Sequence, residues 1–284
     1  MDQRIIYLYD SFTHGEISRR DFIDHAATIV GSTAAAAALL PLMANDYATA
    51  ATIAPDDRRL AIDRTSYDSL NGKITAMLAR PKAKGNRPAV IVIHENRGLN
   101  PHIEDIARRL AVEGFLAIAV DLLSVAGGTP ANEDQARDLH AKANKRDMLN
   151  AAVAAVAFAK QHPESTGKVG AVGFCYGGGV VNAMAVASAD LTAAVAYYGM
   201  QPPADKVPSI QAALLLHYAG LDQRVNAGIA AYEAALKANS KSYTIYIYPN
   251  VNHAFNNDTG DRYNKAAADL AWSRTLAFLK ENLG

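Results

Sequence analysis

The sequence predicts an α/β protein, with a doubly wound, mostly parallel sheet and an N-terminal helical extension. Short, nearly continuous apolar runs recur from residue 89 onward, and such runs are typical of strands covered on both faces. Helical stretches separate these runs, as in a doubly wound sheet. The 284 residues suffice for one large domain plus an extension. We therefore expect residues 1–55 to form the extension and linker, and residues 56–284 to form the α/β domain.

The N-terminal extension supports two interpretations. Ser18-Arg19-Arg20-Asp21-Phe22 resembles a twin-arginine export motif, and a small-residue apolar stretch follows over residues 26–44. Alternatively, a helix over residues 2–13, a stop at Gly15 and a second helix capped by Ser18 form a folded hairpin. Both interpretations stay open. The first places the protein in the periplasm, and the second in the cytoplasm.

A stable membrane anchor is not expected from the apolar stretch. Alanine dominates it, and Ser32, Thr33 and Pro41 dilute its hydrophobicity. Residues 45–58 are polar and contain Pro55, which favours a linker.

The α/β domain is expected to open with an antiparallel hairpin. Residues 60–66 and 73–79 flank Asn71-Gly72, a dipeptide that favours a tight turn. The expected central strands are residues 89–94, 115–120, 169–174, 193–198, 212–218 and 243–248. The expected helices are residues 103–113, 145–161, 178–188, 226–238 and 261–282. Ligands of such sheets bind beyond the carboxyl ends of the strands, so the loops there are where functional residues are expected.

A nucleophile elbow is indicated by Gly173-Phe174-Cys175-Tyr176-Gly177, which has the G-x-S-x-G form with sulfur in place of oxygen. A strand that turns at once into a helix strains the backbone at the nucleophile and requires small residues beside it. The start of the helix also favours a thiolate, because its free N–H groups stabilise negative charge. The alternative is a buried structural cysteine in a glycine-rich turn.

A base and an orienting carboxylate follow the elbow in the chain. His253 comes just after the last expected strand, and Asp222 comes just after the strand over residues 212–218. An aspartate at a strand end also commonly caps the next helix. The order Cys175, Asp222, His253 nevertheless matches that of α/β-hydrolases, which is the fold we predict.

An oxyanion hole is expected from two backbone N–H groups, one of Tyr176 and one of Asn96. The loop that contains Asn96 also carries Glu95 and Arg97, an acid and a base expected to face the same pocket. A solvated ion pair between these neighbours is the alternative.

These motifs resemble the dienelactone hydrolase family, whose members combine a cysteine elbow of the form G-F-C-x-G-G with this triad order. The resemblance spans residues 60–283. It implies that Glu95 accepts the thiol proton and that the resting thiol is neutral and hydrogen-bonded to Glu95. The family's arginines for a substrate carboxylate have no counterpart in residues 122–125 or 254–257. Arg97 is the expected substitute cation.

The expected activity is hydrolysis of a small-molecule ester or lactone through a thioester on Cys175. Transfer of the acyl group to another acceptor and a non-catalytic binding role are the alternatives.

Zero formal net charge gives no sign of nucleic-acid binding. A single cysteine excludes an internal disulfide and a multi-cysteine metal cluster. No metal or organic cofactor is implied, and a homodimer stays open.

Overall fold

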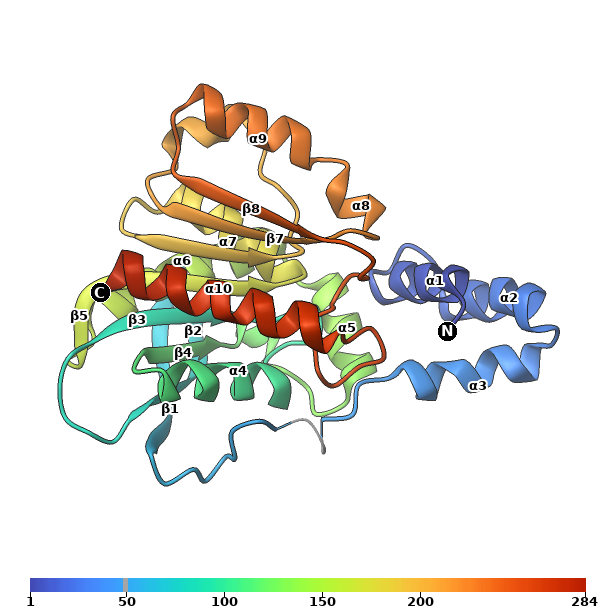
Figure 1. Ribbon diagram of the computed structural model, residues 1–284. Helices are drawn as coiled ribbons and strands as arrows, with labels where there is room; N and C mark the ends of the chain where they lie inside the picture. The colour runs from blue at the N-terminus through green and yellow to red at the C-terminus, as the bar shows by residue number, and fades with distance from the viewer. Residues whose placement is uncertain (48–50) are drawn as a thin grey trace.

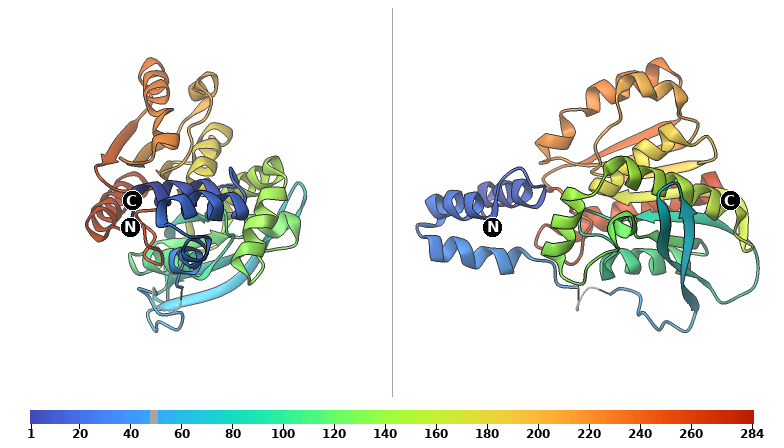
Figure 2. Two further views of the ribbon diagram at one scale, coloured as in Figure 1. Left: turned by 90° about the vertical axis from the view of Figure 1, so that its right-hand side faces the viewer. Right: turned by 180° about the vertical axis from the view of Figure 1, so that it is seen from behind.

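The computed structural model describes residues 1–47 and 51–284. A single eight-stranded sheet, with strand order β1-β2-β4-β3-β5-β6-β7-β8, carries helices on both faces, and three N-terminal helices project from one end of it (Figures 1 and 2). The strands are β1 (Leu60–Ser69), β2 (Gly72–Pro81), β3 (Arg87–Ile93), β4 (Leu116–Val120), β5 (Ser165–Phe174), β6 (Ala193–Tyr197), β7 (Ala213–Ala219) and β8 (Tyr243–Tyr248). This is the predicted α/β-hydrolase fold.

The sheet is parallel except at one side. β1 and β2 form the predicted hairpin, with Ser69 opposite Gly72, and β2 also runs antiparallel to β4. All pairings from β4 through β3 to β8 are parallel. The carboxyl ends of the parallel strands therefore meet at one edge, where the predicted site residues follow β3, β5, β7 and β8.

The helices of the α/β domain match the expected stretches, with additions. They are α4 (Pro101–Val112), α5 (Glu133–Lys142), α6 (Lys145–Gln161), α7 (Tyr176–Ala187), α8 (Gln223–Asn226), α9 (Ile229–Ala238) and α10 (Lys265–Leu283), with short 3-10 helices at Leu122–Ala126 and Ala204–Ser209. α5, α8 and the 3-10 helices were not predicted, and the helix expected over residues 226–238 begins three residues later, as α9.

One strand differs from its expected environment. β8 was predicted to be covered on both faces, but it is the last strand of the sheet and Ile247 is 54% exposed. An edge strand has a neighbour on one side only, so its apolar composition does not guarantee burial.

The extension consists of α1 (Gln3–Thr13), α2 (Arg19–Val30) and α3 (Thr33–Met43). Its own small core contains Ile5, Tyr9, Phe12, Phe22, Ala26, Ala36, Leu40 and Met43. Ser18 caps α2 through a capping box with Asp21, and Gly15 adopts a φ of 77° between α1 and α2. The expected helices of the hairpin are thus confirmed, and α3 is added to them.

No single helix among the described residues is long and apolar enough to cross a membrane. Only α2 and α3 together meet the length and composition, and they are bent by 113° at the break between them. The predicted linker over residues 45–58 includes residues 48–50, which lie outside the described residues. The domain division after residue 55 stays a prediction.

Candidate active site

Cys175 occupies a strained turn between β5 and α7. Its φ of 55° and ψ of −118° are unfavourable for a residue with a side chain. A Cβ added at Gly173 would lie 2.1 Å from the carbonyl oxygen of Gly177, and one added at Gly177 would lie 2.4 Å from that of Ile93. Both positions therefore require glycine, as the elbow motif predicts. The turn places the sulfur at the N-terminus of α7, near N–H groups that have no partner within the helix.

Asp222 and His253 lie together at the same edge of the sheet. His253 Nδ1 is 2.6 Å from Asp222 Oδ2, and both side chains are buried. Asp222 Oδ1 also accepts a hydrogen bond from the backbone N–H of Val225 at 3.1 Å. The orienting and capping roles considered for this aspartate therefore coexist, one on each carboxylate oxygen. The other ring nitrogen, His253 Nε2, has no hydrogen-bond partner among the described residues.

The charges around Cys175 favour a thiolate. Burial acts to raise the pKa of the thiol, but the positive charges of His253 and His14 outweigh burial and lower this pKa to about 6. For His253, burial acts to lower the pKa, and the negative charges of Cys175 and Asp10 and the bond to Asp222 raise it to about 10. Cys175 and His253 thus favour a thiolate–imidazolium pair.

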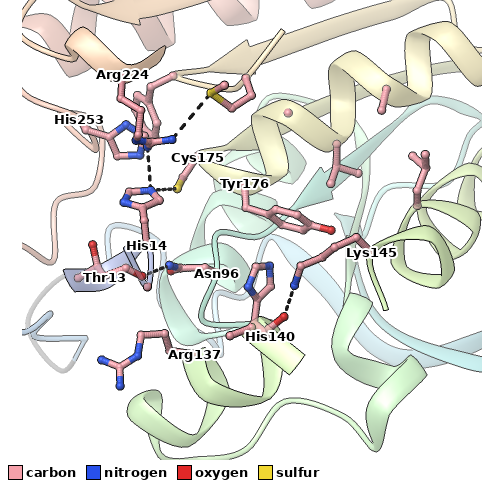
Figure 3. A pocket seen from close by; sticks show the side chains of 18 of the residues that line it. Thr13, His14, Asn96, Arg137, His140, Lys145, Cys175, Tyr176, Arg224 and His253 are labelled. Carbon is pink, nitrogen blue, oxygen red and sulfur yellow. Dashed lines mark hydrogen bonds between the residues drawn. The ribbon is translucent and has the colours of Figure 1, made fainter. Parts of the chain in front are cut away.

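His14, from the end of α1, also reaches the sulfur (Figure 3). Its Nε2 lies 3.3 Å from Cys175 Sγ, and its ring centroid lies 5.0 Å from that of His253. Arg224, at the start of α8, donates to the same Nε2 from Nη2 at 3.0 Å. The sequence patterns described above single out neither His14 nor Arg224. No sequence motif marks these two residues, because their contact with each other and with the sulfur depends on how α1 docks against the α/β domain.

Glu95 lines the same small pocket as Cys175 and His253, but the hydrogen bond to the thiol that the family resemblance implies is not formed. Its Oε2 accepts a hydrogen bond from Asn257 Nδ2 at 2.9 Å, and no bond to Cys175 is found among the described residues. The thiol's hydrogen bond is instead to His14. The expectation of a neutral resting thiol held by Glu95 therefore differs from the structure, because a neighbouring amide satisfies the carboxylate.

Asn96 and Arg97 make contacts that tie the extension to the α/β domain. Asn96 Nδ2 donates to the carbonyl oxygen of Thr13 at 2.6 Å. Arg97 is buried in an ion pair with Glu133 and lies 3.5 Å from the hydroxyl of Tyr9. The charge of Arg97 is therefore already neutralised, which disfavours the substrate-binding role expected for it. The oxyanion-hole roles of Tyr176 and Asn96 rest on backbone N–H groups and stay predictions.

A cavity of about 1030 Å³ opens over Cys175 and is walled in part by the extension. This volume suits a small-molecule ligand. Five basic residues line it, namely Arg19, Arg137, Lys145, Lys206 and Arg224, whereas Asp138 is the sole acidic residue among its described lining. His140 packs edge-on against Tyr176, and burial lowers the pKa of His140 to about 3, so it adds no charge near neutral pH. Three of these cations are ion-paired, Arg137 with Asp134 and Asp138, Lys206 with Asp205 and Arg224 with Glu16. Arg19 and Lys145 have no ion pair among the described residues, so the cavity keeps a modest excess of positive charge.

Two sets of side chains lie close enough to hold a metal ion. The ligand atoms of His14, Cys175 and His253 all lie within 4.8 Å of one another, as do those of Asp10, Asp222 and His253. Each set contains part of the predicted triad, whose hydrogen bonds already account for the proximity. The absence of a required cofactor stays a prediction.

Comparisons with known proteins divide the chain in two. A model described as the dienelactone hydrolase family matches residues 74–283, and one described as YqhI-like matches residues 1–31. A Saccharolobus solfataricus protein, provisionally named a carboxymethylenebutenolidase, is 31% identical over 75% of this chain and 96% of its own length. An Escherichia coli protein with the same provisional name is 33% identical over 80% and 89%. The crystal structure of a Klebsiella pneumoniae protein, provisionally named a dienelactone hydrolase, aligns with a TM-score of 0.70 and 30% identity, covering 78% of this chain and 99% of that one.

Proposed function

Because the chain belongs to the dienelactone hydrolase family, we propose that it hydrolyses a lactone or carboxylic ester through a thioester on Cys175. The observation that carries this proposal is the pairing of His253 Nδ1 with Asp222 at 2.6 Å. It orients the ring and leaves Nε2 of His253 without a partner among the described residues. Cys175 lies in the elbow beside that ring.

Acylation begins with the thiolate. Cys175 Sγ attacks the substrate carbonyl, a C–S bond forms, and the negative charge moves to the carbonyl oxygen. As the tetrahedral intermediate collapses, the C–O bond to the leaving group breaks and His253 Nε2–H protonates the departing alkoxide. In a lactone the ring opens and the alcohol stays attached to the acyl group. A thioester on Cys175 and a neutral His253 remain.

Deacylation reverses these roles with water. His253 Nε2 removes a proton from water, whose oxygen attacks the thioester carbonyl. The C–S bond then breaks, the carboxylic acid is released, and Cys175 returns to the thiolate beside protonated His253. In both steps the backbone N–H groups of Tyr176 and Asn96 are the proposed donors to the oxyanion. Asp222 holds the ring and stabilises its positive charge.

The proposed substrates carry a negative charge. Five basic residues and a single acidic one line the cavity in its described part, and Arg224 contacts His14, whose Nε2 lies 3.3 Å from the reacting sulfur. Electropositive walls raise the local concentration of anions and orient a carboxylate. This cation comes from α8 rather than from the loop that contains Arg97.

The test is a panel of lactones and aryl esters in which each carboxylate-bearing compound is paired with a neutral analogue. Wild type is compared with Cys175→Ala and Cys175→Ser, and thermal melting checks that all three are folded. We expect Cys175→Ala to be inactive, and mass spectrometry of wild type with a slow substrate to show one added acyl group. The carboxylate-bearing member of each pair should have the lower KM. Full activity of Cys175→Ala would refute the nucleophile assignment, and equal KM values within pairs would refute the anionic substrate class.

A further inference from the structure

The end of α1 is built to present an imidazole to Cys175. His14 Nδ1 lies 2.7 Å from the carbonyl oxygen of Asp10. A carbonyl oxygen can only accept, so Nδ1 carries a hydrogen and donates it. This bond fixes the tautomer and leaves Nε2 as the acceptor, which faces Cys175 Sγ at 3.3 Å and Arg224 Nη2 at 3.0 Å. The arrangement parallels the other side of the sulfur, where Asp222 fixes His253. The thiol thus lies beside two oriented imidazoles from different parts of the chain (Figure 3).

Hydrogen bonds on two sides hold α1 in this position. The carbonyl oxygen of Thr13 accepts from Asn96 Nδ2 at 2.6 Å, in the loop after β3. Asp10 Oδ1 accepts from Arg262 Nη1 at 2.6 Å, in the loop before α10. Gln3 Nε2 donates to Asn252 Oδ1 at 2.5 Å, beside His253. These contacts join α1 to the loops that carry the proposed site, so the position of His14 is fixed by more than its own side chain.

We propose that His14 is a second proton partner of Cys175, so that the N-terminal extension completes the active site. When the neutral thiol ionises, its S–H bond breaks, an N–H bond forms at His14 Nε2, and this nitrogen no longer accepts from Arg224. The thiolate formed in this way is the species that begins acylation, and His14 keeps the proton through the cycle. His253 Nε2 remains available for the leaving alkoxide and for water. The inference rests on the proposed function, because it takes Cys175 as the nucleophile.

Several charged groups face the His14 ring. Asp10 Oδ2 lies 3.6 Å from Nδ1 and stabilises a protonated ring, whereas Arg224 and His253 oppose a further positive charge. Glu16 lies 3.6 Å from Arg224 and partly offsets its charge. His14 also lies in residues 1–31, which match a separate family model and lie outside the 74–283 matched by the dienelactone hydrolase model. The family assignment therefore does not supply this role.

The experiment uses the full-length chain with His14→Ala and His14→Gln. Glutamine keeps a polar group of similar reach but does not take up a proton near neutral pH. His25→Ala is the matched control, because His25 is an exposed histidine of the same extension. Thiolate absorbance near 240 nm is titrated with pH against a Cys175→Ala blank. Alkylation by iodoacetamide and kcat/KM for an aryl ester are measured at pH 7, and thermal melting checks the fold.

We expect the thiolate midpoint to rise by about one pH unit in both His14 variants, because a charged partner within hydrogen-bonding reach shifts a pKa by about 1–3 units. Alkylation at pH 7 and kcat/KM should each fall by about twofold, because moving the midpoint from about 6 to about 7 lowers the thiolate fraction at pH 7 from roughly nine-tenths to one-half. His25→Ala should match wild type. If folded His14→Gln titrates and alkylates like wild type while Cys175→Ala is inactive, the inference about His14 is overturned and the proposed function stands. If Cys175→Ala retains activity, the proposed function itself fails.

Discussion

Cys175, Asp222 and His253 follow the carboxyl ends of β5, β7 and β8, whereas His14 reaches the same site from α1, 161 residues before the cysteine. The first three meet because parallel strands of one sheet end at a common edge. His14 meets them only because α1 accepts hydrogen bonds from two loops of the α/β domain, at the carbonyl oxygen of Thr13 and the carboxylate of Asp10. One group is placed by topology and the other by docking.

The two regions also differ in their cores. The sheet is packed on both faces by two large clusters of buried residues, whereas the extension has a separate cluster of eight. Burial of apolar area is the main source of stability, so the extension has less to hold it. Local opening should therefore start there, and its effects on the site should be separable from those of the sheet.

The largest expected effect comes from the region placed by topology. Asp222→Asn should keep the fold but lower kcat by about 10⁴-fold, as loss of the orienting carboxylate does in a serine triad, because His253 then adopts the wrong tautomer. Steady-state kinetics on an aryl ester measure this. Asp205→Asn is the control, since Asp205 is exposed in a 3-10 helix. A loss of less than tenfold would remove Asp222 from the proposed triad.

The next effect concerns the core of the extension. Phe22 is fully buried and its ring lies 6.2 Å from that of Tyr9 and 5.8 Å from that of Phe12. Phe22→Ala should cost about 3–5 kcal/mol. Hydrogen exchange followed by mass spectrometry should show faster exchange in α1–α3 and unchanged exchange in the central strands. Leu42→Ala is the control, because Leu42 is 66% exposed on α3. Equal acceleration in the sheet would show that the two regions unfold together.

A moderate effect is expected from pH. The lowered pKa of Cys175, about 6, means that the thiolate fraction rises as pH increases through 6 and falls about tenfold per unit below it. kcat/KM for a neutral ester should follow this rise, then decrease as pH passes the raised pKa of His253, about 10, where the proton for the leaving group is lost. A lower midpoint near 9, the ordinary thiol value, would contradict the thiolate–imidazolium pair.

The smallest effect concerns the joint between the two regions. Arg262 and Asp10 pair at 2.6 Å, and both side chains are 16% exposed. Such a pair contributes about 1 kcal/mol, so Arg262→Gln should speed hydrogen exchange of α1 about fivefold. Arg4→Gln breaks a far more exposed pair on the same helix and should leave exchange nearly unchanged. Identical exchange in both variants would show that this ion pair does not hold α1.

Local pattern was sufficient to predict the sheet and the elbow. Strand composition, the Asn71-Gly72 turn and the glycines beside Cys175 each depend on neighbours in sequence. α5 was missed because Ala136 and His140 are its only buried residues, which leaves almost no apolar periodicity to detect. The edge position of β8 depends on strand order, which composition does not encode.

The environment of the candidate site was harder to predict, because it depends on contacts distant in sequence. Glu95 is bonded to Asn257 and Arg97 to Glu133, and neither partner is adjacent in the chain. His14 and Cys175, which also form a hydrogen bond, are likewise distant in sequence. The sequence pattern identified the types of residue that the proposed chemistry needs. Which acid, base or histidine contacts Cys175 depends on tertiary packing.

The hydrogen bonds from Gln3 to Asn252 and from Arg262 to Asp10 join positions 249 and 252 residues apart. The ribosome makes α1 about 250 residues before these loop partners, so the helix has no docking site until they are made. Closing so long a loop also has an entropic cost that only a folded sheet can offset. Until residues 252–262 are made and the sheet has folded, the nascent chain therefore carries Cys175 without either imidazole docked beside it.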